Sequence, residues 1–487
     1  MNSAEPDIGP DQGEHIPEGF FASLDISSPK RIAIFLACLA ASLAVALYPR
    51  ITADLTPAAT RALFILVFAA SLWVTGAIPA FAVGILVIGL QIVLLGKPGG
   101  VFAETEHDWE QFVAVIGHPL VWLFFGGFVL AAGMTRTGLD RGLASGLLGR
   151  FGDRPGSVLL GVMGATFVLS MFVSNTATAA MMLALLVPLL ASLDADDPYA
   201  TGLLLGVATA ANLGGMGSLI GSPPNAIAVG VLAQHGGEIT FLEWMVVGLP
   251  PALLLLAVAW FLIGRLYPSR RERLPVAAWG GGPDSAATAV PRWERLVVGG
   301  TLLLTVGLWL TSQWHGIPTA AVSFIPIVLL TTTGVLGAKA IRGLSWDVLF
   351  LLAGGLALGQ TVTETGLSTW IVEQLPVEGL GLLPLAAAMA FLTVVLSNFM
   401  SNTAAANILV PIGATMAVGN EVWVAVPIAL AASCAMCLPI ATPPNALAFA
   451  TGRIQTRDFI RLGLVLGVLG PAVALSWIAV IALWVSG

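Results

Sequence analysis

The chain has 487 residues, of which 57% are hydrophobic and only 10% are charged, and its mean hydropathy is +0.93. These values lie outside the range of soluble globular proteins and indicate an all-α polytopic membrane protein in contact with a lipid bilayer. The net charge of −7 carries little information, because orientation in a membrane depends on where Lys and Arg lie. Nucleic acid is not an expected partner.

The first half begins with a polar segment, residues 1–29, which lacks a signal-peptide pattern and is predicted to be a disordered cytoplasmic tail. Residues 30–60 hold the first transmembrane segment. Windows long enough to cross a hydrocarbon core of about 30 Å then follow one another. They cover 31–48, 61–78, 80–96, 119–135, 155–192, 200–233 and 243–267.

Two of these windows are interrupted by polar or helix-breaking residues. Residues 155–192 are long for one helix and carry Ser174-Asn175-Thr176 at their middle, which predicts a re-entrant hairpin that turns at this polar tip. Residues 200–233 contain Gly221-Ser222-Pro223-Pro224-Asn225. Since consecutive prolines cannot sit inside a regular helix, the sequence predicts a broken helix here.

After a hydrophilic linker, residues 268–293, the same order of elements returns. The windows are 294–312, 318–337, 347–363, 379–418, 422–450 and 459–485. Ser401-Asn402-Thr403 repeats the first polar tip 227 residues later, and Thr442-Pro443-Pro444-Asn445 repeats the proline pair, with Asn445 220 residues after Asn225. Landmarks in the same order at nearly one offset indicate an internal duplication covering 61–267 and 294–487.

Basic residues indicate that the two repeats are inverted. The loops before the first hairpin and after the last broken helix are basic, whereas their counterparts in the other half contain no Lys or Arg. The basic residues are Arg136, Arg141, Arg150 and Arg154 in the first loop and Arg453, Arg457 and Arg461 in the second. Because cytoplasmic loops are enriched in such residues, corresponding loops face opposite sides. This predicts 11 transmembrane segments plus two re-entrant hairpins, with the N-terminus cytoplasmic and the C-terminus outside.

An inverted repeat brings its polar tips together near the bilayer midplane, beside the two broken helices. Hydroxyl, amide and carbonyl oxygens there suit a hard cation such as Na⁺, and helix N-termini suit an anion. No Lys or Arg lies close in sequence to either tip, so an anion would depend on neutral donors, helix dipoles and neighbouring cations. A single tip of this kind is usually a helix-packing cluster. Its repetition in inverted halves favours a transport site.

These paired motifs resemble the divalent anion:Na⁺ symporter family of sodium-coupled dicarboxylate, citrate and sulfate carriers, over about residues 60–487. The resemblance implies a homodimer that works by an elevator mechanism. It also implies scaffold helices within 61–150 and 294–378, and mobile hairpin and transport helices within 155–267 and 379–487.

The resemblance also implies which residues bind the ions and the substrate, with two or more coupling Na⁺. One Na⁺ site would use Ser170, Ser174, Asn175 and the Gly221 carbonyl, and the other would use Ser397, Asn402 and the carbonyls of Met400 and Ala441. Substrate carboxylates would meet Asn175, Thr176, Ser222, Asn402, Thr403, Thr442 and Pro443. Position 397 is Ser where family members have Thr, and Thr178 is matched by Ala405 in the second half.

We therefore expect a Na⁺-coupled symporter of a small divalent anion in a bacterial-type inner membrane, with a C4-dicarboxylate such as succinate, malate or fumarate favoured. Sulfate or citrate symport and dicarboxylate exchange are the first alternatives, and a channel or an arsenite-type permease is a more remote one. An intramembrane enzyme is disfavoured, because the sequence has no H-E-x-x-H motif and only five His. Cys434 and Cys437 lie in apolar sequence, which favours a packing role over a redox or metal site.

Overall fold

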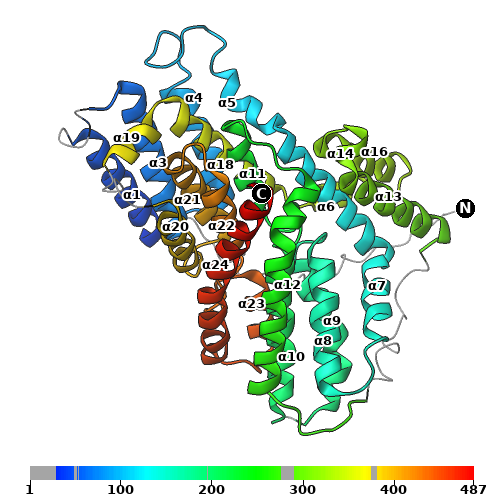
Figure 1. The fold of residues 1–487 in the computed structure, drawn as a ribbon. Coiled ribbons are helices and arrows are strands. Elements are labelled where there is room, and N and C mark those ends of the chain that lie inside the picture. The colour runs from blue at the N-terminus through cyan, green and yellow to red at the C-terminus, as the bar shows by residue number, and fades with distance from the viewer. Residues whose placement is uncertain are drawn as a thin grey trace, which may run out of the picture.

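A computed structural model describes residues 29–48, 52, 54–194, 196–275, 290–374 and 381–486. The described residues form helices and loops, with no strand among them (Figure 1). Residues 1–28 of the predicted tail, residues 276–289 of the predicted linker and residues 375–378 of the predicted scaffold segment 294–378 lie outside the described residues. The prediction of an all-α polytopic membrane protein is confirmed.

The first half contains helices in the order that the apolar windows predict. They are α1 (Pro29–Leu47), α3 (Pro57–Thr75), α4 (Ala80–Leu94), α5 (Glu110–Ala114), the 3₁₀ helix η1 (Val115–Gly117), α6 (Pro119–Thr137), α7 (Leu139–Leu148), α8 (Pro155–Ser170), α9 (Asn175–Ser192), α10 (Pro198–Gly214), α11 (Pro223–Gln234) and α12 (Phe241–Leu266).

The second half repeats this order after the linker. Its helices are α13 (Arg292–Leu310), α14 (Ser312–His315), α15 (Thr319–Val322), α16 (Phe324–Thr332), α17 (Ala338–Arg342), α18 (Trp346–Glu364), α19 (Leu367–Gln374), α20 (Leu382–Ser397), α21 (Asn402–Met416), α22 (Val422–Ala432), α23 (Pro443–Ala450) and α24 (Thr456–Ser486). Among the described residues, eight helical segments are long and apolar enough to cross a membrane.

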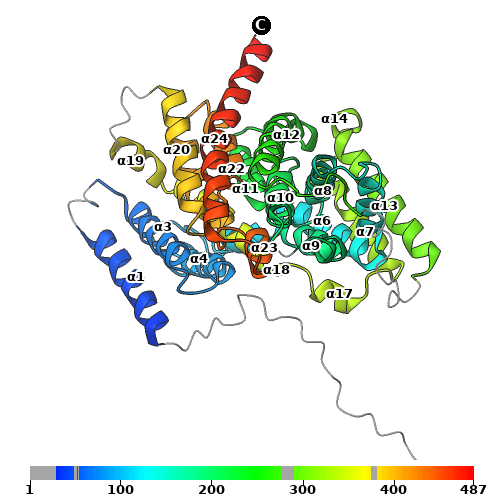
Figure 2. The same ribbon diagram turned by 90° about the horizontal axis from the view of Figure 1, so that it is seen from below.

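The helices form a central group with a smaller group on each side. Figures 1 and 2 place α1, α3 and α4 on one side, α13 with its neighbours α14 and α16 on the other, and α10, α12, α22 and α24 between them. Packing agrees with this arrangement: α4 packs on α18 and α6 on α13 and α16, while the hairpin helices pack on the broken helices, as α8 does on α10 and α20 on α22. Each flanking group therefore combines helices from both halves.

Glycines allow α4 and α18 to pack closely. A Cβ added at Gly84 would lie 2.7 Å from the Phe350 carbonyl oxygen, so a larger residue could not be accommodated without a shift of the backbone. The buried amide of Gln91 donates to the Ala357 carbonyl and to Thr361 Oγ1, both at 2.9 Å. The contact between a first-half and a second-half helix is thus both close and partly polar.

Loops from both halves meet at one end of the molecule, the lower end in Figure 1, where α8 and α10 begin and α9 ends. Three exposed ion pairs hold the segment after α12 against the base of the first hairpin and the turn before α10: Arg270–Asp196 (2.7 Å), Arg271–Asp194 (3.3 Å) and Arg273–Asp153 (3.2 Å). The hydrogen bond from Arg270 keeps the pKa of Asp196 below its usual value. The Arg453 carbonyl accepts from Thr201 Oγ1 at 2.9 Å, which brings the second basic loop to this end.

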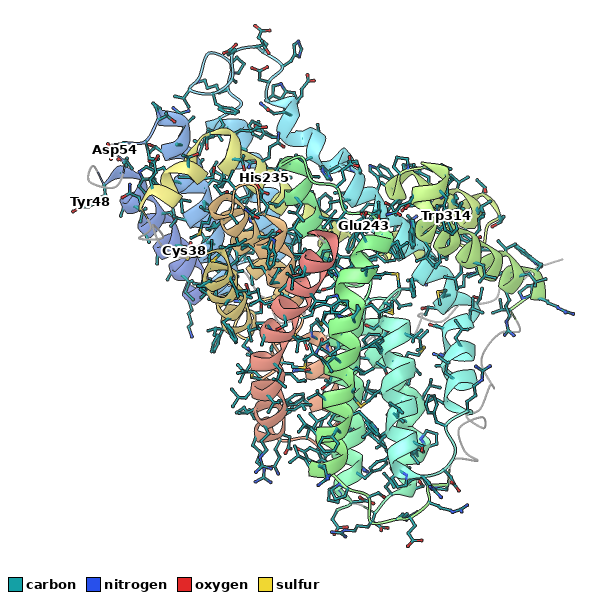
Figure 3. All side chains as sticks on the ribbon, viewed as in Figure 1. Cys38, Tyr48, Asp54, His235, Glu243 and Trp314 are labelled. Carbon is teal, nitrogen blue, oxygen red and sulfur yellow. The ribbon has the colours of Figure 1, made fainter. Side chains whose placement is uncertain are left out.

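The opposite end carries loops that contain few basic residues. Figure 3 places His235, Glu243 and Trp314 near this end. Gln313 Nε2 donates to Glu243 Oε1 at 3.1 Å and joins the start of α12 to the short helix α14. Loops that the sequence assigns to the same side of the membrane are therefore in contact with each other at each end.

Candidate functional site

The first polar tip is a four-residue break between α8 and α9. Helix α8 ends at Ser170 and α9 begins at Asn175, with Ser174 as its N-cap, whose Oγ accepts from the backbone N–H of Ala177 at 3.3 Å. Such a cap satisfies one of the N–H groups that a helix start leaves unpaired. Ser174 and Thr176 are exposed, whereas Asn175 is half-buried. The motif thus both ends one helix and starts the next.

The Asn175 carboxamide lies among oxygens from the hairpin and the broken helix. One of its terminal atoms is 2.7 Å from Ser170 Oγ, 3.2 Å from the Ala211 carbonyl oxygen and 3.3 Å from the Gly221 carbonyl oxygen. If this atom is the amide nitrogen, it donates to all three; if it is Oδ1, four oxygens face one another. Ser170 Oγ, fully buried, lies 2.7 Å from the Ala211 carbonyl oxygen as well. The structure thus brings Ser170, Asn175 and Gly221 together.

Two glycines in the break between α10 and α11 make room for this contact. A Cβ on Gly215 would lie 2.9 Å from the Asn175 amide, and one on Gly221 would lie 2.7 Å from the Gly215 carbonyl oxygen. Any side chain at Gly215 would therefore push the tip away from the break in the helix. The close approach of backbone and tip is the reason that this segment requires glycine.

Asn225 satisfies the carbonyls that the break between α10 and α11 leaves without helical partners. Its fully buried Nδ2 donates to the carbonyls of Gly215 and Ser218, both at 2.8 Å. Trp244 Nε1 donates to the Met216 carbonyl at 3.2 Å, and Ser218 Oγ donates to the Met171 carbonyl at the hairpin tip. Irregular backbone within the core is thus hydrogen-bonded by protein groups alone.

The second polar tip repeats the first in outline. Helix α20 ends at Ser397, α21 begins at Asn402, and Ser401 Oγ caps α21 by accepting from Ala404 N at 3.1 Å. Ser397 is fully buried, and neither its Oγ nor Asn402 Oδ1 has a hydrogen-bond partner among the described residues. Two buried oxygens that need a partner therefore lie on either side of this tip.

Asn398, next to Ser397, attaches the second tip to its broken helix. Its Nδ2 donates to the Val394 carbonyl at 2.8 Å, and its Oδ1 accepts from the backbone N–H of Cys437 at 2.8 Å. Cys437 lies in the break between α22 and α23, four residues before Ala441. The predicted ligands Met400 and Ala441 are both buried, and among the described residues no hydrogen bond joins Ala441 to Ser397 or Asn402.

In the second break, between α22 and α23, Asn445 takes the role that Asn225 has in the first. Asn445 Nδ2 donates to the carbonyls of Met436 (3.2 Å) and Leu438 (3.0 Å), and Thr442 Oγ1 caps α23 by accepting from Asn445 N at 3.3 Å. In both copies of the Pro-Pro-Asn motif, the asparagine side chain therefore donates to carbonyls of the unwound segment that precedes it. The duplication seen in the sequence extends to individual hydrogen bonds.

The predicted substrate residues share one structural position, the N-terminal end of a helix. Ser222 and Thr442 are the N-caps of α11 and α23, and Pro443 is the first residue of α23. Asn175 and Thr176 open α9, and Asn402 and Thr403 open α21. Helix α9 packs against α23 and α21 against α11, so one helix of each hairpin packs against the broken helix of the other half. Helix N-termini carry unpaired N–H groups and a partial positive charge, which favour an anion.

A buried asparagine in α10 joins the two broken helices directly. Asn212 Nδ2 donates to Thr442 Oγ1 at 3.0 Å and to Asn445 Oδ1 at 3.2 Å. The sequence does not single out Asn212 or Asn398, since no repeated motif contains either. Asn225 and Asn445 belong to the repeated Pro-Pro-Asn motif, which could have identified them as structural residues.

Acidic or sulfur ligands do not contribute to this site. Among the described residues, no group of three or more His, Cys, Asp and Glu side chains could hold a metal ion. Cys434 and Cys437 are free thiols, and Cys434 is fully buried. A cation bound at either tip would therefore be held by neutral oxygens.

Comparison with known proteins identifies related chains. The family model described as a citrate transporter matches residues 63–432. The sodium-dependent dicarboxylate transporter SdcS of Staphylococcus saprophyticus is 32% identical over 439 residues, which cover 82% of each chain. SdcS of Staphylococcus aureus is also 32% identical, over 440 residues and 82% of each chain.

A solved structure shares the fold at low sequence identity. The chain resembles MtrF of Neisseria gonorrhoeae, from a class of antimetabolite efflux pumps, with 13% identity and a TM-score of 0.51 over 82% of this chain and 94% of that one. At this level of identity the likeness concerns the fold alone.

We predict that Asn225→Ala destabilises the protein by roughly 2 kcal/mol or more, because it leaves two buried carbonyls without a donor. The measurement is thermal unfolding of the detergent-purified protein. Gln360→Ala serves as the control, since Gln360 Nε2 makes only an exposed hydrogen bond to Glu364. Equal unfolding temperatures for Asn225→Ala and wild type would contradict the role assigned to this amide.

Proposed function

The chain belongs to the citrate transporter family of divalent anion:Na⁺ symporters, and we propose that it carries a C4-dicarboxylate such as succinate, malate or fumarate together with Na⁺. It is a multi-pass membrane transporter and not an enzyme. The related chains are likewise named as transporters. The observation that carries the substrate proposal is the set of four helix N-termini at the two tips and the two breaks, with oxygen groups beside them.

For the first Na⁺ we propose Ser170, Ser174, Asn175 and the Gly221 carbonyl. The cluster around Asn175 supports this assignment, because Ser170 Oγ and the Gly221 carbonyl lie 2.7 and 3.3 Å from one amide atom. With Oδ1 facing these oxygens, the group consists of neutral oxygens with the Ser170 hydroxyl hydrogen as its one donor, which suits a small hard cation. Na⁺ is here a co-transported substrate.

For the second Na⁺ we propose Ser397, Asn402 and the carbonyls of Met400 and Ala441. Support comes from the two buried oxygens, Ser397 Oγ and Asn402 Oδ1, that lack hydrogen-bond partners among the described residues. A buried oxygen without a partner costs about 1–3 kcal/mol, which coordination to a cation would offset. The serine at position 397 supplies the hydroxyl that threonine supplies in the family.

The substrate carboxylates would be bound between the tips by Asn175, Thr176, Ser222, Asn402, Thr403, Thr442 and Pro443. The proposal rests on the positions of these residues in the first turns or caps of α9, α11, α21 and α23. Each helix start contributes roughly half a positive charge, and N–H groups point toward the ligand. The two carboxylates of a C4-dicarboxylate, separated by its carbon chain, would accept hydrogen bonds from helix N-termini on two sides of the site.

We further propose 11 transmembrane segments, two re-entrant hairpins and an inverted repeat. The protein would lie in the plasma (inner) membrane with its N-terminus in the cytoplasm. Helices α8 and α20 have 16 residues each, which corresponds to about 24 Å of helix and falls short of a 30 Å core. The contact of basic loops from both halves at one end supports their location in the cytoplasm.

An elevator mechanism in a homodimer completes the proposal. The scaffold would contain α3, α4 and α6 with α13, α16 and α18, and the mobile part would contain the hairpins and broken helices. Packing is consistent with this division: α4–α18 and α6–α16 contacts join the first set, and α8–α10, α20–α22 and α11–α21 contacts join the second. Helix α18 also contacts α11 and α21, where the two parts would meet. The mobile part would carry both tips and both breaks as one unit.

The proposal predicts that purified protein in liposomes takes up labelled succinate when a Na⁺ gradient is imposed. Replacing Na⁺ with K⁺ or choline is expected to reduce uptake to the level of protein-free liposomes. Equal uptake with and without Na⁺ would contradict coupling and would favour exchange.

Competition of unlabelled anions with labelled succinate identifies the transported anion. Excess unlabelled malate and fumarate are expected to suppress succinate uptake, and excess citrate or sulfate is expected to have little effect. Citrate is the principal competitor, since the matching family model is described as a citrate transporter. Transport of citrate or sulfate in the absence of succinate transport would replace the proposed substrate.

We predict that Asn175→Ala and Asn402→Ala each reduce Na⁺-driven uptake to the background level, because each removes an amide oxygen proposed to contact both cation and anion. Size-exclusion chromatography of both variants is expected to match wild type, because neither side chain belongs to the proposed scaffold. The Gln360→Ala variant provides the control. Normal uptake kinetics in either tip variant would refute the assignment of that tip.

A further inference from the structure

Asn212 makes the two halves of the candidate site unequal. It is 1% exposed and lies in the last turn of α10. Helix α22, which takes the place of α10 in the second half, contains no Asn or Gln, and Ser433 follows it. The duplicated site therefore contains one buried amide with no counterpart in the other half.

The amide of Asn212 restricts what the hydroxyl of Thr442 can do. A threonine hydroxyl has two acceptor lone pairs and one hydrogen to donate. Thr442 Oγ1 accepts from Asn445 N at 3.3 Å and from Asn212 Nδ2 at 3.0 Å, so both lone pairs are used. Only the hydrogen remains, and Thr442 stands at the N-terminal end of α23. Its remaining hydrogen-bonding capacity is thus that of a donor.

Ser222, in the corresponding position of the first half, is not restricted in this way. It is the N-cap of α11, but its side chain makes no capping hydrogen bond. Helix α22 offers no side-chain amide to it, because it contains neither Asn nor Gln. The Ser222 hydroxyl can consequently act as donor or acceptor.

We propose that Asn212 is a positioning residue that fixes the Thr442 hydroxyl as a hydrogen-bond donor to one carboxylate of the bound dicarboxylate. The inference rests on the proposed function, since it takes Thr442 to contact the substrate. At one end of the site the Thr442 hydroxyl is then fixed as a donor, whereas at the other end the Ser222 hydroxyl can donate or accept. Because a preset donor needs no reorientation when the anion arrives, Asn212 contributes to affinity without touching the anion itself.

The test is a double-mutant cycle between Asn212 and Thr442. Thr442→Val is expected to raise the KM for succinate about 10-fold, which is the scale of one hydrogen bond to a charged group. Asn212→Ala is expected to raise it about threefold, because the freed hydroxyl must be reoriented before it donates, with kcat changed less in both variants. Adding Asn212→Ala to Thr442→Val is expected to raise KM no further, because the amide acts through the hydroxyl. The Na⁺ concentration for half-maximal uptake is expected to stay within about twofold of wild type. Additive effects on KM would overturn the inference.

Two further variants separate positioning from folding. Asn212→Leu keeps a similar volume in the buried position, and it is expected to behave as Asn212→Ala does. Gln234→Ala is the matched control, because it also removes an amide donor from the first broken helix, where Gln234 Nε2 donates to the Leu356 carbonyl at 3.3 Å. It is expected to leave the succinate KM unchanged. A wild-type KM in the Asn212→Leu variant would overturn the inference as well.

Failure of the proposed function would be recognised separately. Wild-type protein that takes up no succinate refutes the dicarboxylate proposal, and the same cycle is then measured with citrate or sulfate, whichever the wild type carries. Non-additive KM effects with that anion would uphold the role of Asn212, and additive effects would refute it. The two proposals therefore fail on different measurements.

Discussion

Backbone that leaves helical geometry inside a membrane must find its hydrogen-bond partners within the protein, and much of this structure follows from that requirement. Each half interrupts one long helix, which leaves carbonyls without intrahelical donors. Asn225 and Asn445 supply the missing donors, each to two carbonyls of its own break. The two prolines before each asparagine occupy the first positions of α11 and α23, where a missing N–H breaks no helical hydrogen bond, and the asparagine supplies donors to the unwound carbonyls before them.

The breaks and the hairpin tips are not independent features, because hydrogen bonds join them. In the first half, Ser218 Oγ donates to the Met171 carbonyl, and the Asn175 amide lies against the Gly221 carbonyl. In the second half, Asn398 Oδ1 accepts from Cys437 N. Tip and break therefore form one packed unit in each half, and Asn212 joins the two units. A site built on such a unit keeps its geometry if the unit moves as a whole.

Local sequence predicts the places where helices end, but not the contacts between the resulting ends. Apolar windows, repeated Ser-Asn-Thr and repeated Pro-Pro-Asn predict the breaks after Ser170 and Ser397 and between α10 and α11. Local sequence does not predict the roles of Asn212 and Asn398, because Asn212 is a single polar residue in an apolar segment and the position of Asn398 is Met171 in the first half. Their partners lie 230 and 39 residues away, at Thr442 and Cys437, and only the folded chain brings them together.

The polar groups at the four helix starts are neutral, and this limits how an anion can be bound. The tips and breaks contain no Lys or Arg. Four helix N-termini supply only partial positive charges, and the transfer of a dianion from water into a low-dielectric site costs many kcal/mol. Cations bound beside Asn175 and Asn402 would supply the missing charge, so binding of the anion would depend on theirs. A lysine at either tip would remove that dependence, and the proposed coupling to Na⁺ would therefore be a consequence of which residues the tips lack.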